Sequence, residues 1–169
     1  MSKIFLSIAF VFLSIVTLAQ KEETVEGDGT KIVKGFFTKQ ELASDPAFSW
    51  YIQNQQNFKP DSIAVEALKL HGKSLYVLAF GGTWCGDTKS LLPKFYALTE
   101  AADFPEDHVT LIGVDRSKKT LYNLTEAFNV TNVPTFIVLK NGKEIGRVVE
   151  YGKYGVIDKE IGEIILAAK

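Results

Sequence analysis

Two short apolar runs, residues 75–80 (LYVLAF) and 109–115 (VTLIGVD), constrain the fold of this chain most. Neither run shows the polar alternation of a half-exposed strand, so both are typical of strands buried on both faces. Between them, Leu91, Phe95 and Leu98 recur at spacings of four and three, which predicts a helix. Because a helix joins the two strands, we expect them to lie parallel in one sheet.

The segment after the second run adds an antiparallel pair to this sheet. A third strand is predicted at residues 135–139, and Asn141-Gly142 is a strong hairpin signal that leads into a fourth strand at 144–149. A stripe of isoleucines indicates a last helix: Ile157, Ile161 and Ile164. The pattern predicts an α/β fold with a mixed central sheet of four or five strands and helices on both faces.

The N-terminal residues predict the domain organisation. Residues 1–19 combine a basic Lys3, an apolar run and small residues before a polar stretch, which is the layout of a secretory signal peptide. The apolar run is shorter than the roughly 20 residues that span a membrane, although an uncleaved N-terminal anchor is the alternative. We interpret residues 20–34 as a linker or frayed segment. Residues 35–169 then form one domain with a helical extension at 35–72.

Cap signals place several further elements. Residues 30–37 suggest a short additional strand, Thr38 and Glu41 fit a capping box, and Asp45-Pro46 predicts the start of a second helix. A third helix is expected after Asp61, with one face and an end formed by Ile63, Ala67, Leu70 and Gly72. A helix capped by Ser117 is expected after residue 115, with this inner face: Leu121, Leu124 and Phe128.

Composition excludes several classes of function. The chain has 169 residues and a net charge of −1, and no block of Lys or Arg suggests a nucleic-acid partner. Without residues 1–19, which include Lys3, the balance is 18 basic against 20 acidic residues, or −2. The two histidines, His71 and His108, lie far apart, and with one cysteine they give no metal-ligand spacing. We therefore expect neither a metal nor another cofactor.

Cys85, the only cysteine of the chain, lies between a predicted strand and the first turn of a predicted helix. A helix N-terminus favours negative charge, so this position favours a reactive thiolate. Thr88, one helical turn later, can donate a hydrogen bond to a thiolate but cannot form a disulfide. The charge of Asp87 acts against a neighbouring thiolate. The alternative is that Cys85 is a small, buried and inert side chain.

The sequence around Cys85 resembles the thioredoxin superfamily over residues 75–168. Trp84-Cys85-Gly86 follows a buried strand, and Pro93 stands where thioredoxins carry a proline in the same helix. Val-Pro-Thr before the third strand resembles the second signature of that family. The resemblance implies a thioredoxin-like fold in which Pro134 is cis and faces Cys85, and in which Val133 offers backbone groups to a substrate.

Three departures from the family pattern accompany these matches. Thr88 replaces the second, resolving cysteine. The resemblance places Ala79 and Leu111 where many thioredoxins carry a buried Asp and the Lys that pairs with it. The thiol that would resolve a mixed disulfide is therefore missing together with its acid–base support.

The resemblance therefore predicts a single-thiol exchange protein. Cys85 would attack a disulfide and form a mixed disulfide, and an external thiol would have to release it. The candidate catalytic residues are Cys85 and Thr88, and the candidate substrate-binding residues are Trp84, Gly86, Asp87, Val133 and Pro134. The alternative is a non-catalytic binding module that holds client peptides beside Pro134.

Partners and location are expected on the same grounds. The partner would be a disulfide-bearing protein or a low-molecular-weight thiol, and an external reductant would be needed. We expect an exported protein, periplasmic or secreted from a bacterial cell envelope, with no stable membrane insertion once residues 1–19 are removed. A monomer is expected, with a dimer linked through Cys85 as the other outcome.

Overall fold

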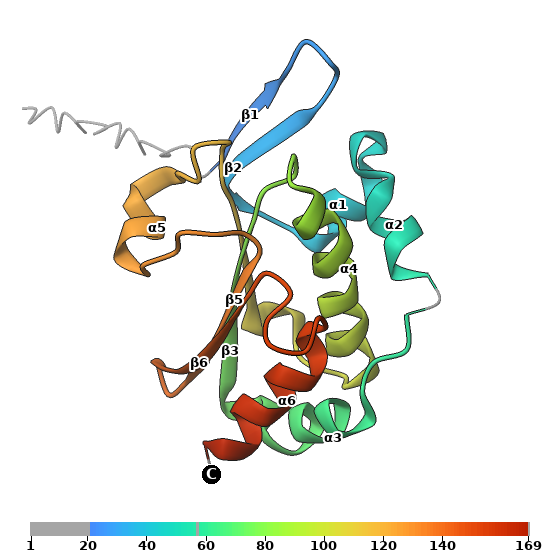
Figure 1. Cartoon of the computed structure of the whole chain (residues 1–169), viewed down its shortest axis with the longest axis vertical. Helices are drawn as coiled ribbons and strands as arrows, with labels where there is room; N and C mark the ends of the chain where they lie inside the picture. Colours follow the sequence, from blue (N-terminus) through green and yellow to red (C-terminus); the bar gives the residue numbers. More distant parts are fainter. Residues whose placement is uncertain (1–20, 57, 169) are drawn as a thin grey trace, which may run out of the picture.

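The computed structural model describes residues 21–56 and 58–168, which form a six-stranded mixed sheet with helices on both faces (Figure 1). The strand order is β1-β2-β4-β3-β5-β6, and only the central β3 and β4 are parallel to each other. The strands are β1 (Lys21–Val25), β2 (Lys31–Phe37), β3 (Leu75–Gly81), β4 (Val109–Gly113), β5 (Thr135–Lys140) and β6 (Lys143–Val149). The predicted α/β fold class is confirmed, with one strand more than expected.

Alternation along the central strand gives the sheet two separate cores. Val77 and Ala79 of β3 face the larger core, which α1 to α4 and α6 cover, whereas Leu78 and Phe80 face a smaller core. Figure 1 shows α5 alone on one face and the other helices gathered on the opposite face. The helices are α1 (Lys39–Ser44), α2 (Trp50–Gln55), α3 (Ser62–His71), α4 (Gly86–Ala101), α5 (Leu124–Ala127) and α6 (Ile157–Ala167).

The N-terminal hairpin corrects the interpretation of residues 20–34 as a linker. Residues 21–25 and 31–37 pair as antiparallel strands, and β2 then pairs with β4 at the edge of the central sheet. The sequence of β1 is polar and its side chains are mostly exposed, so it carries no hydrophobic periodicity that would predict a strand. The signal-peptide prediction for residues 1–19 lies outside the described residues.

The cap signals locate the N-terminal helices correctly, although the predicted second helix is divided. Thr38 and Glu41 form the expected capping box of α1. Asp45 accepts a hydrogen bond from the Ala47 N–H and opens a 3₁₀ turn at Pro46–Phe48, and α2 begins only at Trp50. Asp61 caps α3 as predicted.

The predicted inner face of α3 is correct for Ala67 and wrong for its other two residues. Ile63 and Leu70 are exposed, at 63% and 74%, while Ala64 and Ala67 are buried. The reason is the packing of α3 on α6, where a Cβ on Gly162 would lie 2.8 Å from the Ala64 Cα. This close approach selects the face of α3 that carries small side chains.

The helix predicted from Ser117 is also wrong. Asp115 instead folds a turn, in which its Oδ1 accepts hydrogen bonds from the backbone N–H groups of Ser117 and Lys119. A 3₁₀ turn follows at Leu121–Asn123, and Tyr122 and Asn123 adopt positive φ angles of 59° and 54°. These left-handed residues interrupt the helix, so α5 is limited to one turn.

Pro93 lies inside α4, as predicted, and its effect is compensated by another helix. Proline has no backbone N–H, so the carbonyl of Lys89, four residues earlier, lacks its usual helical donor. Asn54 of α2 supplies one, because its Nδ2 donates to the Lys89 carbonyl at 2.9 Å. The predicted inner face of α4 is confirmed by three buried side chains: Leu91, Phe95 and Leu98.

Candidate functional site

Cys85 is the N-cap residue of α4, directly after the loop that leaves β3. Its side chain is partly exposed, and its Sγ donates a hydrogen bond to the Val133 carbonyl at 3.4 Å. The thiol therefore combines access to solvent with a position at the positive end of a 16-residue helix. Two environments were expected for Cys85, an accessible thiol and a buried, inert one. This geometry matches the accessible thiol.

The loop that faces the thiol contains a cis peptide bond between Val133 and Pro134, as the resemblance predicted. The Pro134 carbonyl accepts a hydrogen bond from the Glu150 N–H at 2.7 Å, which ties this loop to the end of β6. The Thr135 hydroxyl donates to the Asn132 carbonyl at 2.7 Å. Both sides of the cis bond are thus held by hydrogen bonds, next to the cysteine.

Thr88 is buried beneath the loop that carries Cys85. Its Oγ1 accepts a hydrogen bond from the Gly82 N–H at 3.2 Å, and its Cγ2 lies against Gly81. In the described part of the chain, the hydroxyl is thus engaged with the loop backbone and not with the Cys85 sulfur. The hydrogen bond that we expected from Thr88 to the thiolate is absent from this geometry, and Thr88 supports the loop.

Ala79 and Leu111 are direct neighbours in the register of β3 and β4. Both side chains are buried in the larger core, and both are apolar. The two positions that the resemblance assigns to a buried acid and its lysine partner therefore meet in space. They provide packing and no proton acceptor.

Trp84 is held by contacts that its position beside Cys85 did not reveal. Its Nε1–H donates to the Val114 carbonyl at 3.0 Å, and the Arg116 Cζ lies 5.4 Å from the centre of its ring. Arg116 in turn pairs with Glu26 of the β1–β2 turn. A pairing across 90 residues leaves no signal in local sequence patterns, so sequence reasoning missed Arg116 and Glu26.

Tyr151, in the loop after β6, also belongs to the surroundings of Cys85. The nearby Asp87 carboxylate raises the pKa of the Tyr151 hydroxyl above its usual value, with burial and Cys85 acting in the same direction and Ser90 in the opposite one. Asp87 itself follows Gly86, which is exposed at the start of α4. Sequence reasoning missed Tyr151, for which an exposed aromatic after a strand was the only available signal.

The comparisons with known proteins agree with this geometry. The family model described as Thioredoxin matches residues 52–163. The chain belongs to the thioredoxin family. The thioredoxin of Echinococcus granulosus is 38% identical over 96 residues, which cover 57% of this chain and 83% of that protein. The thioredoxin of Chlamydia trachomatis is 36% identical over 109 residues, which cover 64% and 87% respectively.

Among solved structures, a protein of unknown function from Pseudomonas aeruginosa is similar to this chain with a TM-score of 0.55. The identity is 18%, and the match covers 77% of this chain and 91% of the other, so it shows the fold alone. The thioredoxin relatives support a role in thiol–disulfide redox chemistry in general. They equally imply disulfide-bearing substrates and dependence on a reductant.

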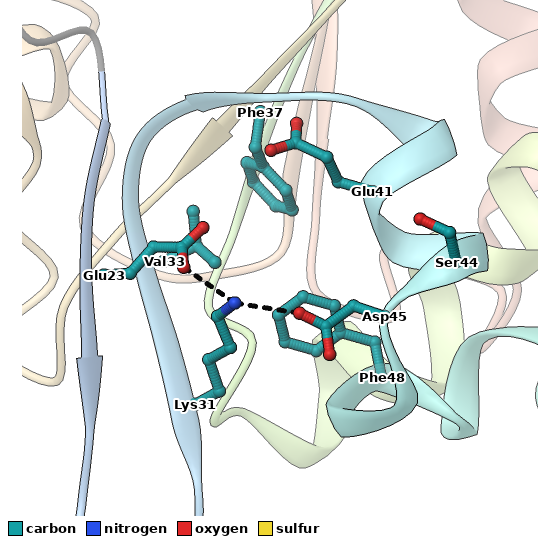
Figure 2. Close-up of a pocket in the computed structure, with 8 residues that line it drawn as sticks. All are labelled: Glu23, Lys31, Val33, Phe37, Glu41, Ser44, Asp45 and Phe48. Atoms are coloured by element: carbon teal, nitrogen blue, oxygen red, sulfur yellow. Dashed lines mark hydrogen bonds and ion pairs between the residues drawn. The ribbon is translucent and has the colours of Figure 1, made fainter.

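The N-terminal hairpin and α1 precede the part of the chain that matches the thioredoxin family. They enclose a pocket of about 210 Å³, whose lining is drawn in Figure 2. Lys31 lies at its wall and pairs with Glu23 at 2.7 Å and with Asp45 at 2.8 Å. The first pair joins the two strands of the hairpin, and the second joins the hairpin to the end of α1, so we attribute the pocket to the packing of the hairpin against α1.

The described residues offer no other site of a different chemistry. Among residues 21–56 and 58–168, no cluster of three or more His, Cys, Asp or Glu side chains is placed to hold a metal ion. In the same residues, no helix has both the length and the apolar character needed to cross a membrane. The candidate site of this thioredoxin-family protein is the surface around Cys85, where the thiol contacts the loop with the cis bond to Pro134.

Proposed function

We propose that this chain is an exported thioredoxin-family protein that performs thiol–disulfide exchange with Cys85 as its single nucleophile. The observation that supports the proposal most directly is the 3.4 Å hydrogen bond between the Cys85 Sγ and the Val133 carbonyl, beside the cis bond to Pro134. This contact supports a site in which an extended peptide pairs with the Val133 backbone beside the sulfur. A disulfide in that peptide would then lie within reach of the thiol.

The exchange has two steps. The Cys85 thiolate attacks one sulfur of a substrate disulfide, the S–S bond breaks, and the other sulfur leaves as a thiolate. The product is a mixed disulfide on Cys85. An external thiol then attacks this bond, its proton passes to solvent, and Cys85 leaves as a thiolate while the substrate and the external thiol become joined by a disulfide.

The external thiol is required because the site offers no internal one. Thr88 stands at the resolving position, and its hydroxyl is engaged with Gly82. A low-molecular-weight thiol or a second thiol of the substrate can complete the cycle. The first would leave a mixed disulfide on the substrate, and the second would isomerise its disulfides.

The location is proposed from the sequence of residues 1–19. Their basic start, apolar run and small residues support export to a periplasm or to the outside of a bacterial cell. Mass measurement of the protein recovered from the producing cells tests this proposal. An N-terminus near Gln20 is expected, and a chain retaining Met1 in the cytoplasmic fraction would contradict it.

Adduct formation tests the exchange proposal. The protein without residues 1–19 is incubated with oxidised glutathione, and intact mass identifies a glutathione adduct, which is expected on Cys85 and absent in Cys85→Ser. The adduct should disappear on addition of excess reduced thiol. If no adduct forms and Cys85→Ser binds an unfolded peptide as well as the parent does, the exchange proposal is contradicted. That outcome would favour a binding module beside Pro134.

A further inference from the structure

The indole of Trp84 is fixed by contacts from separate segments of the chain. Its Nε1–H donates to the Val114 carbonyl at 3.0 Å, at the end of β4. Gly82 lies so close that a Cβ at this position would stand 2.7 Å from the indole. The Arg116 guanidinium lies over the ring, with its Cζ 5.4 Å from the ring centre. A cation at this distance is attracted to the face of an indole.

Glu26 holds Arg116 in this position over the ring. The Arg116 Nε donates to one oxygen of Glu26 at 2.7 Å and its Nη2 donates to the other, so the pair is bidentate. Two parallel hydrogen bonds fix the plane of the guanidinium as well as its position. Glu26 is itself held in the β1–β2 turn, where its N–H donates to the Thr30 carbonyl at 2.9 Å. The hairpin therefore orients the cation that covers Trp84.

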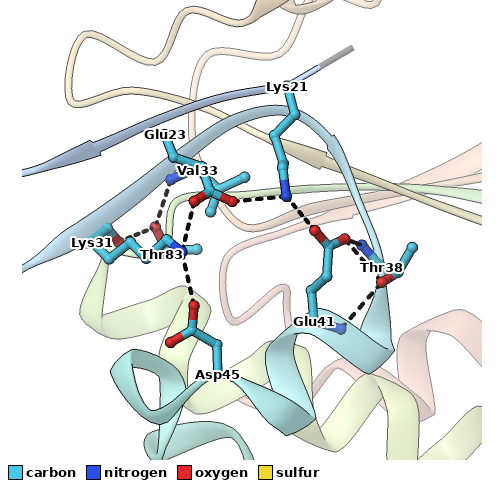
Figure 3. A network of polar contacts seen from close by, with 8 residues as sticks. All are labelled: Lys21, Glu23, Lys31, Val33, Thr38, Glu41, Asp45 and Thr83. Atoms are coloured by element: carbon cyan, nitrogen blue, oxygen red, sulfur yellow. Dashed lines mark hydrogen bonds and ion pairs between the residues drawn. The ribbon is translucent and has the colours of Figure 1, made fainter. Parts of the chain in front are cut away.

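The hairpin contacts the loop before Cys85 at a second, independent place. Figure 3 shows Thr83 between two residues of β2. Its Oγ1 donates to the Lys31 carbonyl at 2.8 Å and accepts from the Val33 N–H at 3.2 Å. The hairpin thus holds Thr83 directly and reaches Trp84, the next residue, through Glu26 and Arg116. The hairpin precedes the segment that matches the thioredoxin family.

We propose that Arg116, oriented by Glu26, is a positioning residue that holds Trp84 and thereby the direction of the Cys85 thiol. The inference rests on the proposed exchange function of Cys85. Trp84 and Cys85 are adjacent, so a fixed indole restricts the backbone that carries the sulfur. Exchange requires the attacking sulfur to lie in line with the disulfide bond, and its rate depends on such orientation.

The charge of Arg116 offers a different explanation, in which the guanidinium simply favours the thiolate of Cys85. The two explanations differ in what Glu26 does. If Arg116 acts by holding Trp84 in position, Glu26→Gln releases the guanidinium and slows exchange. Under simple electrostatics, the same substitution removes a negative charge from the surroundings and leaves exchange equal or faster.

The experiment uses the chain with Trp50→Phe, so that Trp84 is its only tryptophan. Glu26→Gln, Arg116→Gln and Arg116→Lys are made in this background. The control is Lys119→Gln, which breaks a similarly exposed pair with Glu126. Quenching of Trp84 fluorescence by acrylamide reports the freedom of the indole, and the rate of the Cys85 adduct with the neutral 2-hydroxyethyl disulfide reports exchange. Circular dichroism and the urea midpoint confirm that each variant is folded.

We expect Glu26→Gln and Arg116→Gln to raise quenching and to slow adduct formation about threefold, the scale of one exposed cation–π contact. Arg116→Lys should also slow exchange, because an ammonium cannot make the bidentate pair. The control should match the parent. Unchanged quenching, or an exchange rate that Glu26→Gln leaves equal or raises, overturns the proposal. If the parent itself forms no disulfide adduct, the exchange function fails, and the same comparison is made with iodoacetamide alkylation of Cys85.

Discussion

At the scale of the residue, Thr88 shows how this site differs from a two-cysteine site. A resolving thiol must reach the first sulfur, whereas the Thr88 hydroxyl accepts from the Gly82 N–H beneath the loop. The side chain is 1% exposed, so substrate does not contact it directly. We therefore interpret Thr88 as structural support for the loop, which the sequence alone could not distinguish from a hydrogen bond to sulfur.

Thr88→Val is expected to lower the free energy of unfolding by about 1–3 kcal/mol, because the buried Gly82 N–H loses its acceptor while the shape is kept. Urea unfolding measures this change. Thr24→Val, on the exposed face of β1, is the matched control and should change the stability little. Equal midpoints for the two variants would contradict the role assigned to the Thr88 hydroxyl.

At the scale of the element, the N-terminal hairpin is attached to the body of the protein by charge pairs. Across the contact with α1, a hydrogen bond from the Lys31 ammonium holds the pKa of Asp45 below its ordinary value. Within the hairpin, hydrogen bonds from Lys21 and then Lys31 do the same for Glu23. A carboxyl whose pKa is lowered by folding stabilises the fold fully above its unfolded pKa. That contribution is lost as the pH falls through the lower, folded value.

The stability of the hairpin on the body of the protein should therefore be constant from about pH 5.5 to 8. It should fall below about pH 4, near the ordinary pKa range of carboxyl groups. Hydrogen exchange of the β1 and β2 amides, corrected for the intrinsic rates, measures it. In Lys31→Gln the loss of protection with acid should be smaller, because the pair with Asp45 across the contact and the pair with Glu23 within the hairpin are already broken. A loss of protection between pH 6 and 8 would contradict the assignment to carboxylates.

The contact between α3 and α6 predicts an unusual response to a common substitution. Replacing a helical glycine by alanine usually stabilises a helix by up to about 1 kcal/mol. At Gly162 the added methyl would stand 2.8 Å from the Ala64 Cα, so the helices must separate. Gly162→Ala is expected to destabilise by about 1–3 kcal/mol in urea unfolding, as overpacking does.

Gly86→Ala is the control for the direction of this stability change, because Gly86 is also helical and a methyl there meets nothing within 4 Å. It should leave the urea midpoint unchanged or raise it. If Gly162→Ala were as stable as Gly86→Ala, the close approach of α3 and α6 would not exist in solution.

The elements that sequence patterns predicted well are those whose packing leaves a periodic signal. The strands β3 and β4 are mostly buried, so their sequences are continuously apolar, whereas α4 and α6 each bury one face, so their apolar residues repeat with the helical period. β1 lacks this signal because its side chains are exposed. The late start of α5 also left no signal, because Tyr122 and Asn123, just before it, adopt positive φ without being glycine.

The residues of the candidate site likewise divide into those with a sequence signal and those without one. Cys85, Val133 and Pro134 are local features of a known pattern, so the family resemblance located them and the structure brings them together. The side chains of Arg116 and Tyr151 come to the surroundings of Cys85 from other segments of the chain. No spacing in the sequence predicts that these side chains lie near Cys85, because their positions depend on the register of the whole sheet.

At the scale of the whole molecule, the chain combines a thioredoxin-family fold with the chemistry of one thiol. Insulin reduction with dithiothreitol as donor should therefore be weak beside that of a two-cysteine thioredoxin. Thr88→Cys supplies a second thiol and should raise the rate. It should remain below the two-cysteine rate, because Ala79 and Leu111 provide no proton acceptor. Turbidity of the insulin B chain follows the reaction, and a wild-type rate equal to the two-cysteine rate would contradict this account.

The pairing of β2 with β4 has a consequence for the order in which the molecule is assembled. Gly35 faces Gly113 across the ladder, so the two partners are separated by most of the domain. A ribosome releases the first hairpin long before it has made the strand that receives it, while β3 also waits for β4. Contacts of such long sequence separation form late, since the closing loop loses entropy first. The earliest described residues to be synthesised are therefore expected to be among the last to dock.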